Sequence, residues 1–157
     1  DSKAYEALFR RHHARLYGYL VRRCRSPEIA ADLYQETFLR VFRARAQYQP
    51  GRAFRPWLFG IAANAARDRV RREQRRPAEV PLAGWDAPVN AQSVARLHLE
   101  KVVAELPDAL RDAFLLGVVE GFDHHEVAAA LEITPDNARA RISRARRLLR
   151  AALSVDS

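Results

Sequence analysis

The sequence predicts an all-α protein of two small helical domains joined by a linker, with a helix-turn-helix in the second domain. Apolar residues recur at helical spacing along most of the chain, and no clear alternation of apolar and polar residues indicates a strand. Residues 75–88 interrupt this pattern with three prolines and a glycine, which is typical of a linker. With 157 residues the chain is one ordinary domain or two small ones. We place the first domain at residues 1–76, the linker at 77–93 and the second domain at 94–157.

Positive charge is concentrated in two parts of the chain. The net charge is +8, and residues 1–76 carry 18 basic and 7 acidic residues. In the second domain the basic and acidic residues nearly balance, but after residue 136 it contains six arginines and only one acidic residue. A solvated helix face usually mixes both signs, whereas a basic stripe is the electrostatic footprint of phosphate binding. The charge distribution therefore favours a nucleic-acid partner.

Three helices are expected in the first domain. Ser26 and Pro27 supply a hydroxyl cap and a first-turn proline for the second helix. A Gln-Pro-Gly-Arg turn at residues 49–52 separates the second helix from the third. The apolar positions of the three helices are Tyr5, Leu8, Phe9, His12, Leu16 and Tyr19, then Ala30, Leu33, Thr37, Phe38 and Val41, then Phe54, Trp57, Leu58, Ile61, Ala62 and Ala65.

Aromatic residues follow the turn at 49–52, and a basic helix end at 67–76 follows them. Aromatic rings that stack on bases, beside arginines that hold phosphates, are what binding of a single strand requires. Phe54, Trp57 and Phe59 could equally be core residues, because Phe54 and Trp57 lie at helical spacing. The spacing leaves both interpretations open.

The helix-turn-helix is predicted near the C-terminus. Residues 124–131 form a short helix, with Asp123 at its N-cap and Glu126 completing a capping box. Three residues, 132–134, leave room only for a turn, and Thr134 then caps a second helix. That helix has an apolar face and a basic remainder. Its apolar positions are Ala138, Ile142, Ala145 and Leu149, and its basic ones are Arg139, Arg141, Arg144, Arg146, Arg147 and Arg150. Two helices with this connection present the second one to a DNA major groove.

Several segments resemble bacterial sigma factors. Residues 32–38 (DLYQETF) and 54–64 (FRPWLFGIAAN), with the basic tail after them, resemble region 2, and the stretch from Leu106 to Arg146 resembles region 4. Two domains with a short linker, and no room for regions 1.1 or 3, are the layout of the extracytoplasmic-function (group IV) sigma factors of the sigma-70 family. The resemblance covers nearly the whole chain. It implies a promoter-specificity subunit that binds core RNA polymerase, recognises the −35 and −10 elements and aids promoter melting.

The resemblance also implies which residues make the contacts and with which partners. The partners it implies are core RNA polymerase, through the β′ clamp and the β flap, promoter DNA and, as a further candidate, an anti-sigma factor. Contacts to core polymerase are implied for Asp32, Gln35 and Glu36. Contacts to the −10 element are implied for Gln49, Arg52, Phe54, Asn64, Asp68, Arg71 and Arg72. Contacts to the −35 element are implied for Asn137, Arg139, Ala140, Arg141, Ser143 and Arg144.

Two departures from the family pattern affect the second domain. Glu132 occupies a turn position that is usually glycine, because the backbone there favours positive φ, and we expect this to cost about 1 kcal/mol. Ala140 and Ser143 are short, so few side chains reach the bases and −35 affinity leans on phosphate contacts.

Other function classes fit the sequence less well. A free-standing helix-turn-helix regulator that works without polymerase is the nearest alternative. A nuclease needs clustered carboxylates for metal ions, and Asp68 and Glu73 beside arginines do not form such a cluster. Adjacent histidines, as in His124 and His125, diverge on a helix and have no third ligand near them in the sequence, so neither a metal nor another cofactor is expected. We expect no enzymatic activity.

The remaining expectations concern the compartment. The single cysteine, Cys24, excludes an internal disulfide and suits a reducing environment. No apolar run approaches twenty residues and no signal peptide is visible, so we expect a soluble, cytoplasmic protein without membrane insertion.

Overall fold

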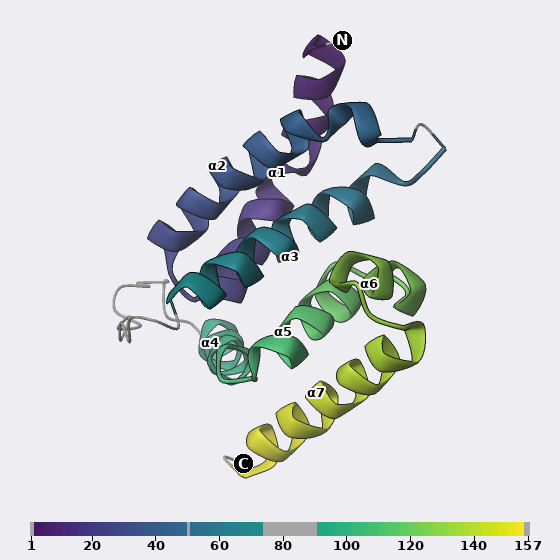
Figure 1. Ribbon diagram of the computed structural model, residues 1–157. Coiled ribbons are helices and arrows are strands. Elements are labelled where there is room, and N and C mark those ends of the chain that lie inside the picture. The colour runs from purple at the N-terminus through teal and green to yellow at the C-terminus, as the bar shows by residue number, and fades with distance from the viewer. Residues whose placement is uncertain (1, 50, 74–90, 156–157) are drawn as a thin grey trace. The chain divides into compact units, whose positions relative to one another are not determined.

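The computed structural model describes residues 2–49, 51–73 and 91–155, and these residues form helices and no strand, which confirms the all-α prediction (Figure 1). The chain divides into two compact units, residues 1–76 and 77–157. Of the predicted linker, residues 77–90 lie outside the described part, and α4 already begins at Ala91. Within the described helices, none is long and apolar enough to cross a membrane.

The first unit is a three-helix assembly with a short 3₁₀ segment. Its elements are α1 (Ser2–Cys24), α2 (Pro27–Arg43), η1 (Arg45–Gln47) and α3 (Phe54–Glu73). The α2 helix begins as predicted, because Ser26 Oγ accepts a hydrogen bond from the Ile29 N–H at 3.3 Å and Pro27 occupies the first position. Figure 1 shows the three helices packed side by side.

The core of the first unit lies where the three helices face one another. The residues that line it are Phe9, Leu16, Tyr19 and Leu20 from α1, Ala30, Leu33, Thr37 and Val41 from α2, and Leu58, Phe59, Ala62, Ala63, Ala65 and Ala66 from α3. Small residues on α3 allow its backbone to approach the other two helices closely. The predicted stripe of α2 matches this core except for Phe38, which is half-buried. Of the predicted α1 stripe, three residues are buried and three are half-buried, and the prediction did not include the buried Leu20.

The buried face of α3 differs from the predicted apolar stripe of this helix. Phe59, which spacing left undecided, is fully buried and packs its ring 5.6 Å from Tyr19. Trp57, which the helical spacing placed in the core, is only half-buried. The physical reason is that α3 faces both α1 and α2, so the buried arc is centred on Leu58, Phe59 and Ala62, and Trp57 falls at its edge.

The second unit is built around its last helix. Its elements are α4 (Ala91–Ala104), α5 (Asp108–Phe114), the π-helical η2 (Leu115–Val119), α6 (His124–Leu131) and α7 (Pro135–Val155). The α4, α5 and α6 helices all pack against α7, and α7 buries Ala138, Ala145 and Leu149 in return. Three of its four predicted apolar positions are therefore buried, and the fourth, Ile142, is half-buried.

Gly117 in η2 explains why Ile142 fits there. A Cβ atom at position 117 would lie 2.6 Å from Ile142 Cδ1, so the absence of a side chain lets α7 approach η2.

A buried arginine joins α4 to α5. The Arg111 side chain donates hydrogen bonds to the carbonyl oxygens of Ala104 at 3.0 Å and Leu106 at 2.6 Å, and it pairs with Asp108. These carbonyls lie where α4 ends, so Arg111 satisfies acceptors that the helix itself leaves open. The stretch from Leu106 to Arg111 therefore fixes the connection that sets α5 against α7.

Candidate nucleic-acid interface

The first helix of the helix-turn-helix starts with the predicted capping box. The Glu126 N–H donates to Asp123 Oδ1 at 2.8 Å, and the Asp123 N–H donates to Glu126 Oε1 at 3.0 Å. The hydrogen bond from the Glu126 backbone lowers the pKa of Asp123 below its ordinary value, so Asp123 is a carboxylate. The entry to α6 is therefore fixed by reciprocal hydrogen bonds.

The turn that follows has the expected strained residue. Glu132 has φ 58° and ψ 44°, in the left-handed region, and its N–H donates to the carbonyl of Ala128. Thr134 Oγ1 then accepts from the Asn137 N–H at 3.1 Å, which confirms the predicted cap of the next helix. The two helices of the motif therefore have the expected short connection.

The α7 helix presents most of its predicted DNA-contacting residues to solvent. Asn137, Arg139, Ala140, Ser143 and Arg144 are exposed, and Arg141 is half-buried. Within the part of the chain that the structure describes, no carboxylate forms an ion pair with an α7 arginine. No ion pair among the described residues therefore neutralises the arginines of this helix.

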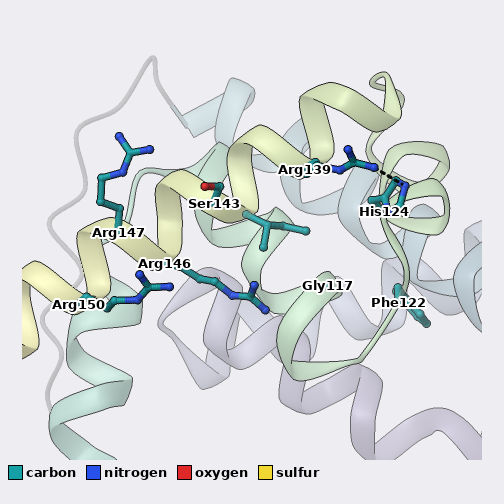
Figure 2. Close-up of a pocket in the computed structure, with 9 residues that line it drawn as sticks. Gly117, Phe122, His124, Arg139, Ser143, Arg146, Arg147 and Arg150 are labelled. Carbon is teal, nitrogen blue, oxygen red and sulfur yellow. Dashed lines mark hydrogen bonds between the residues drawn. The ribbon is translucent and has the colours of Figure 1, made fainter.

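A groove of about 390 Å³ runs beside α7 (Figure 2). It lies between α7 and the segment from η2 to α6, and it is lined by Gly117, Phe122, His124, Arg139, Ile142, Ser143, Arg146, Arg147 and Arg150. Figure 2 shows Arg139 directed toward His124 and Arg146 toward Gly117, whereas Arg147 points away from them. Four arginines along one groove make a surface suited to phosphate groups.

A side-chain contact in this groove joins the two helices of the motif. Arg139 Nη2 lies 3.1 Å from Nε2 of His124, and the dashed line in Figure 2 marks the contact. Arg139, a predicted −35 residue, therefore contacts a histidine to which sequence patterns assign no role.

In the first unit, the predicted turn before α3 is formed. The Arg52 N–H donates to the carbonyl of Gln49 at 2.9 Å, and Tyr48 Oη donates to the carbonyl of Arg52 at 2.6 Å. Gln49 and Arg52 are exposed. Tyr48, which the sequence analysis did not single out, therefore fixes the conformation of this turn.

Aromatic rings gather beside the turn. Phe54 is half-buried, with its ring centroid 5.7 Å from that of Tyr48, 5.8 Å from Trp57 and 5.6 Å from His12. Tyr48 and Trp57 also contact each other at 5.0 Å. We call Tyr48, Phe54 and Trp57 the aromatic cluster; its members are half-buried, so they have both a packed and a solvent-facing side.

His12, which contacts Phe54 of this cluster, is mostly uncharged at neutral pH. Burial, and then the positive charges of Arg55 and Arg11, lower the pKa of His12 below its ordinary value. The ring of His12 against Phe54 therefore acts as an aromatic packing partner.

Polar residues of α3 are held more tightly than the sequence suggested. Asn64 accepts a hydrogen bond from Arg67, and the Asp68 carboxylate pairs with Arg40 of α2 at 2.9 Å. Arg71 and Arg72 are exposed, and Arg72 Nε lies 3.4 Å from the Asp68 carbonyl. Of the α3 residues predicted to contact the −10 element, Asn64 and Asp68 therefore have partners within the protein, whereas Arg71 and Arg72 are exposed.

The acids of α2 are also paired. Glu36 accepts from Arg40 at 3.0 Å, and Asp32 lies 3.4 Å from Arg69 of α3. Asp32 nevertheless remains 71% exposed, and Gln35 is exposed as well. Arg40 therefore bridges a predicted polymerase contact, Glu36, and a predicted −10 contact, Asp68.

Sequence reasoning missed the arginines that organise this surface. Arg40 lies four positions after Glu36, a spacing that predicts an ion pair along a helix, so this contact could have been found. The pairing of Arg40 with Asp68 depends on how α2 packs on α3, and nothing in the sequence gives it. Among the described residues, no group of three or more His, Cys, Asp or Glu side chains is arranged to hold a metal ion.

Comparisons with known proteins agree with both units. Residues 8–76 match the family model described as Sigma-70 region 2, and residues 96–149 match Sigma-70, region 4. The chain is 40% identical to RNA polymerase sigma factor CarQ of Myxococcus xanthus, over 96% of this chain and 89% of that protein. It is 33% identical to ECF RNA polymerase sigma factor SigE of Mycolicibacterium smegmatis, over 98% of this chain and 63% of that protein.

A solved structure shares the fold. The sigma factor RpoE of Bartonella quintana, in co-crystals with the anti-sigma factor NepR, aligns with a TM-score of 0.81 over 99% of each chain. The sequence identity is 23%, so the likeness concerns the fold.

Proposed function

The chain belongs to the extracytoplasmic-function sigma factors of the sigma-70 family, and we propose which of its residues carry each task of that role. It is an RNA polymerase sigma factor, which binds core polymerase and directs promoter-specific initiation through its regions 2 and 4. The observation that carries the proposal is that both regions match in one chain, in the order region 2 and then region 4. We propose residues 1–76 as the first domain and 94–157 as the second, with a linker from residue 77 that ends before α4 begins at Ala91, and not at 93 as the sequence predicted.

The −35 element is the proposed target of α7. Asn137, Arg139 and Arg141 lie in the first two turns, with Ala140, Ser143 and Arg144 on the same helix. The exposed arginines of α7 have no carboxylate partner among the described residues, and this supports the role, because their charge is available to phosphates and base edges. Two of the six positions carry short side chains, so phosphate contacts supply much of the affinity.

The −10 element is the proposed target of the turn at 49–52 and the adjoining face of α3. Gln49 and Arg52 are exposed, and the aromatic cluster lies beside them. Unstacking a base costs a few kcal/mol, and stacking on an aromatic side chain is worth about 1–3 kcal/mol, so the two offset each other. We assign Phe54 the stacking role, and Arg71 and Arg72 phosphate contacts. Asn64 and Asp68 support this face through their bonds to Arg67 and Arg40.

Core polymerase is the proposed partner of Asp32, Gln35 and Glu36 through its β′ clamp. Asp32 and Gln35 are exposed on α2, and acids on an otherwise cationic domain suit a basic partner surface. The second domain would dock on the β flap.

Three further expectations follow from the role and stay proposals. The protein works in the cytoplasm, where polymerase and promoters are, and it has no catalytic chemistry of its own. An anti-sigma factor is a further proposed partner, supported by the complex in which the similar Bartonella quintana fold was solved. A magnesium-dependent cleavage assay tests the absence of nuclease activity, and a pull-down with core polymerase separates this function from a free-standing regulator.

The core-binding assignment is tested by charge reversal. Asp32→Lys with Glu36→Lys should weaken binding to core polymerase without changing helix content in circular dichroism. The matched control is Glu6→Lys with Glu28→Lys, which reverses two exposed acids elsewhere in the same unit. Because Glu36 also pairs with Arg40, the neutral pair Asp32→Asn and Glu36→Gln is measured beside it. Full-strength binding by the double Lys variant would contradict the assignment.

The −10 assignment is tested by permanganate footprinting of polymerase–promoter complexes. Phe54→Ala and a replacement of residues 49–52 should reduce strand opening or alter −10 preference. Arg10→Ala, an exposed α1 residue, is the control for loss of positive charge alone. Normal opening with unchanged base preference in both variants would place −10 recognition elsewhere. A run-off assay over a randomised promoter library then gives the sequence preference directly.

A further inference from the structure

The two adjacent histidines at the start of α6 have no role in the function described so far. Their rings lie 4.4 Å apart, His125 is exposed and His124 is half-buried in the groove beside α7. His124 belongs to the first helix of the motif, and its Nε2 lies 3.1 Å from Nη2 of Arg139 in the second helix. Figure 2 shows that this contact bridges the groove at the N-terminal end of α7.

The chemistry of the two groups assigns their roles in this contact. A guanidinium group has only donors, so Nε2 of His124 must accept the hydrogen bond with its lone pair. The ring proton is then on Nδ1, and the imidazole is neutral. A protonated imidazole would offer an N–H to an N–H and bring two cations to hydrogen-bond distance.

We propose that neutral His124 is a positioning residue for −35 recognition, which holds the Arg139 guanidinium at the edge of α7 in a fixed orientation. The inference rests on the proposed role of Arg139 in the −35 contact. Arginine has five N–H donors, and one is used by His124, so four remain for a base edge or a phosphate. A side chain held in place loses less rotamer freedom when DNA binds, which favours the specific complex.

Absolute affinity is a poor readout for this role, because the arginines along the groove attract phosphates of any sequence. The ratio of binding to intact and scrambled −35 promoters isolates the specific contact.

The experiment uses holoenzyme formed with core polymerase, at fixed salt, on a promoter whose activity depends on its −35 element. His124→Ala should lose preference for the intact −35 element. His124→Gln should keep it, because the amide oxygen can accept from Arg139 in place of Nε2. The matched control is His125→Gln, which should keep the wild-type preference.

Two results would overturn the inference in different ways. If Arg139→Ala keeps full −35 preference, the proposed role of Arg139 fails and the positioning role fails with it. If Arg139→Ala loses preference while His124→Ala keeps it, or His124→Gln loses as much preference as His124→Ala, only the positioning role is wrong.

Discussion

The two basic helices that the sequence associates with DNA, α3 and α7, differ in where their polar side chains are engaged. On α3, Asp68 forms an ion pair with Arg40 of α2, and Arg69 forms one with Asp32 of α2. The buried face of α3 consists largely of glycine and alanine. On α7, the buried face is narrow, and no arginine has a carboxylate partner among the residues that the structure describes.

This difference shows that positive charge has two uses in the molecule. On α3, part of it stabilises the packing of α2 on α3, so a charged residue there is not automatically available to DNA. On α7, it is left for a partner, and the domain tolerates the repulsion because the arginines are spread over exposed surface. Substitutions on α3 should therefore change stability, and substitutions on α7 should change binding.

The largest expected effect is at the core of α3. Phe59→Ala should destabilise the first unit by about 3–5 kcal/mol, because Phe59 is fully buried against Tyr19. Trp57→Ala, its matched control, removes a half-buried ring and should cost less. Urea unfolding of both variants measures the difference. Equal losses would show that the aromatic cluster belongs to the core after all.

The next effect is on α7 and should appear in activity. Arg139→Ala and Arg144→Ala should each lower transcription from a −35-dependent promoter. If the arginine contacts a base, promoter binding should weaken by about 1–3 kcal/mol. If it contacts a phosphate, the slope of log affinity against log salt concentration should fall by about one. Their unfolding free energies should stay within about 0.5 kcal/mol of wild type. Arg43→Ala, an exposed residue at the end of α2, is the control. Unchanged activity and salt dependence in both variants would make the α7 arginines an ordinary solvated face.

A smaller effect is expected where α2 meets α3. Arg40→Ala removes two ion pairs from a side chain that is 26% exposed, and it should cost about 1–2 kcal/mol in unfolding free energy. A double-mutant cycle with Asp68→Ala should give a coupling energy of about 0.5–1 kcal/mol, the contribution of the link between the helices. Additive losses would mean that Arg40 and Asp68 do not stabilise each other, and the contrast between α3 and α7 would weaken.

Much of the local structure could be predicted from the sequence, because it depends on neighbours along the chain. The capping box at Asp123, the Thr134 cap and the left-handed turn at Glu132 each involve residues within a few positions of one another. The stripes of α1 and α2 follow the helical period, since each helix has one dominant packing face.

The rest could not be predicted because it depends on helix packing. The centre of the α3 core depends on two helices packing against it, so spacing alone placed Trp57 too deep. The partners of Asp68 and Asp32 lie 28 and 37 residues away in the chain. The contact between His124 and Arg139 likewise joins two helices, and the presence of two adjacent histidines in the sequence does not predict it.

The smallest expected effect concerns Glu132, in the turn of the helix-turn-helix. Substitutions there distinguish the backbone conformation of the turn from the charge of the α7 arginines. Glu132 has a positive φ of 58°, a conformation that costs a residue with a Cβ about 1 kcal/mol and glycine almost nothing. Glu132→Gly should therefore be about 1 kcal/mol more stable than Glu132→Ala, which removes the same carboxylate and keeps the strain. Comparison with Ala is needed because the glutamate side chain has interactions of its own. Thermal unfolding of the two variants gives this difference, and −35 binding should be equal in both, because neither changes an α7 arginine. Weaker −35 binding by the glycine variant alone would mean that rigidity of the turn, and not only the exposed charge of α7, sets the affinity.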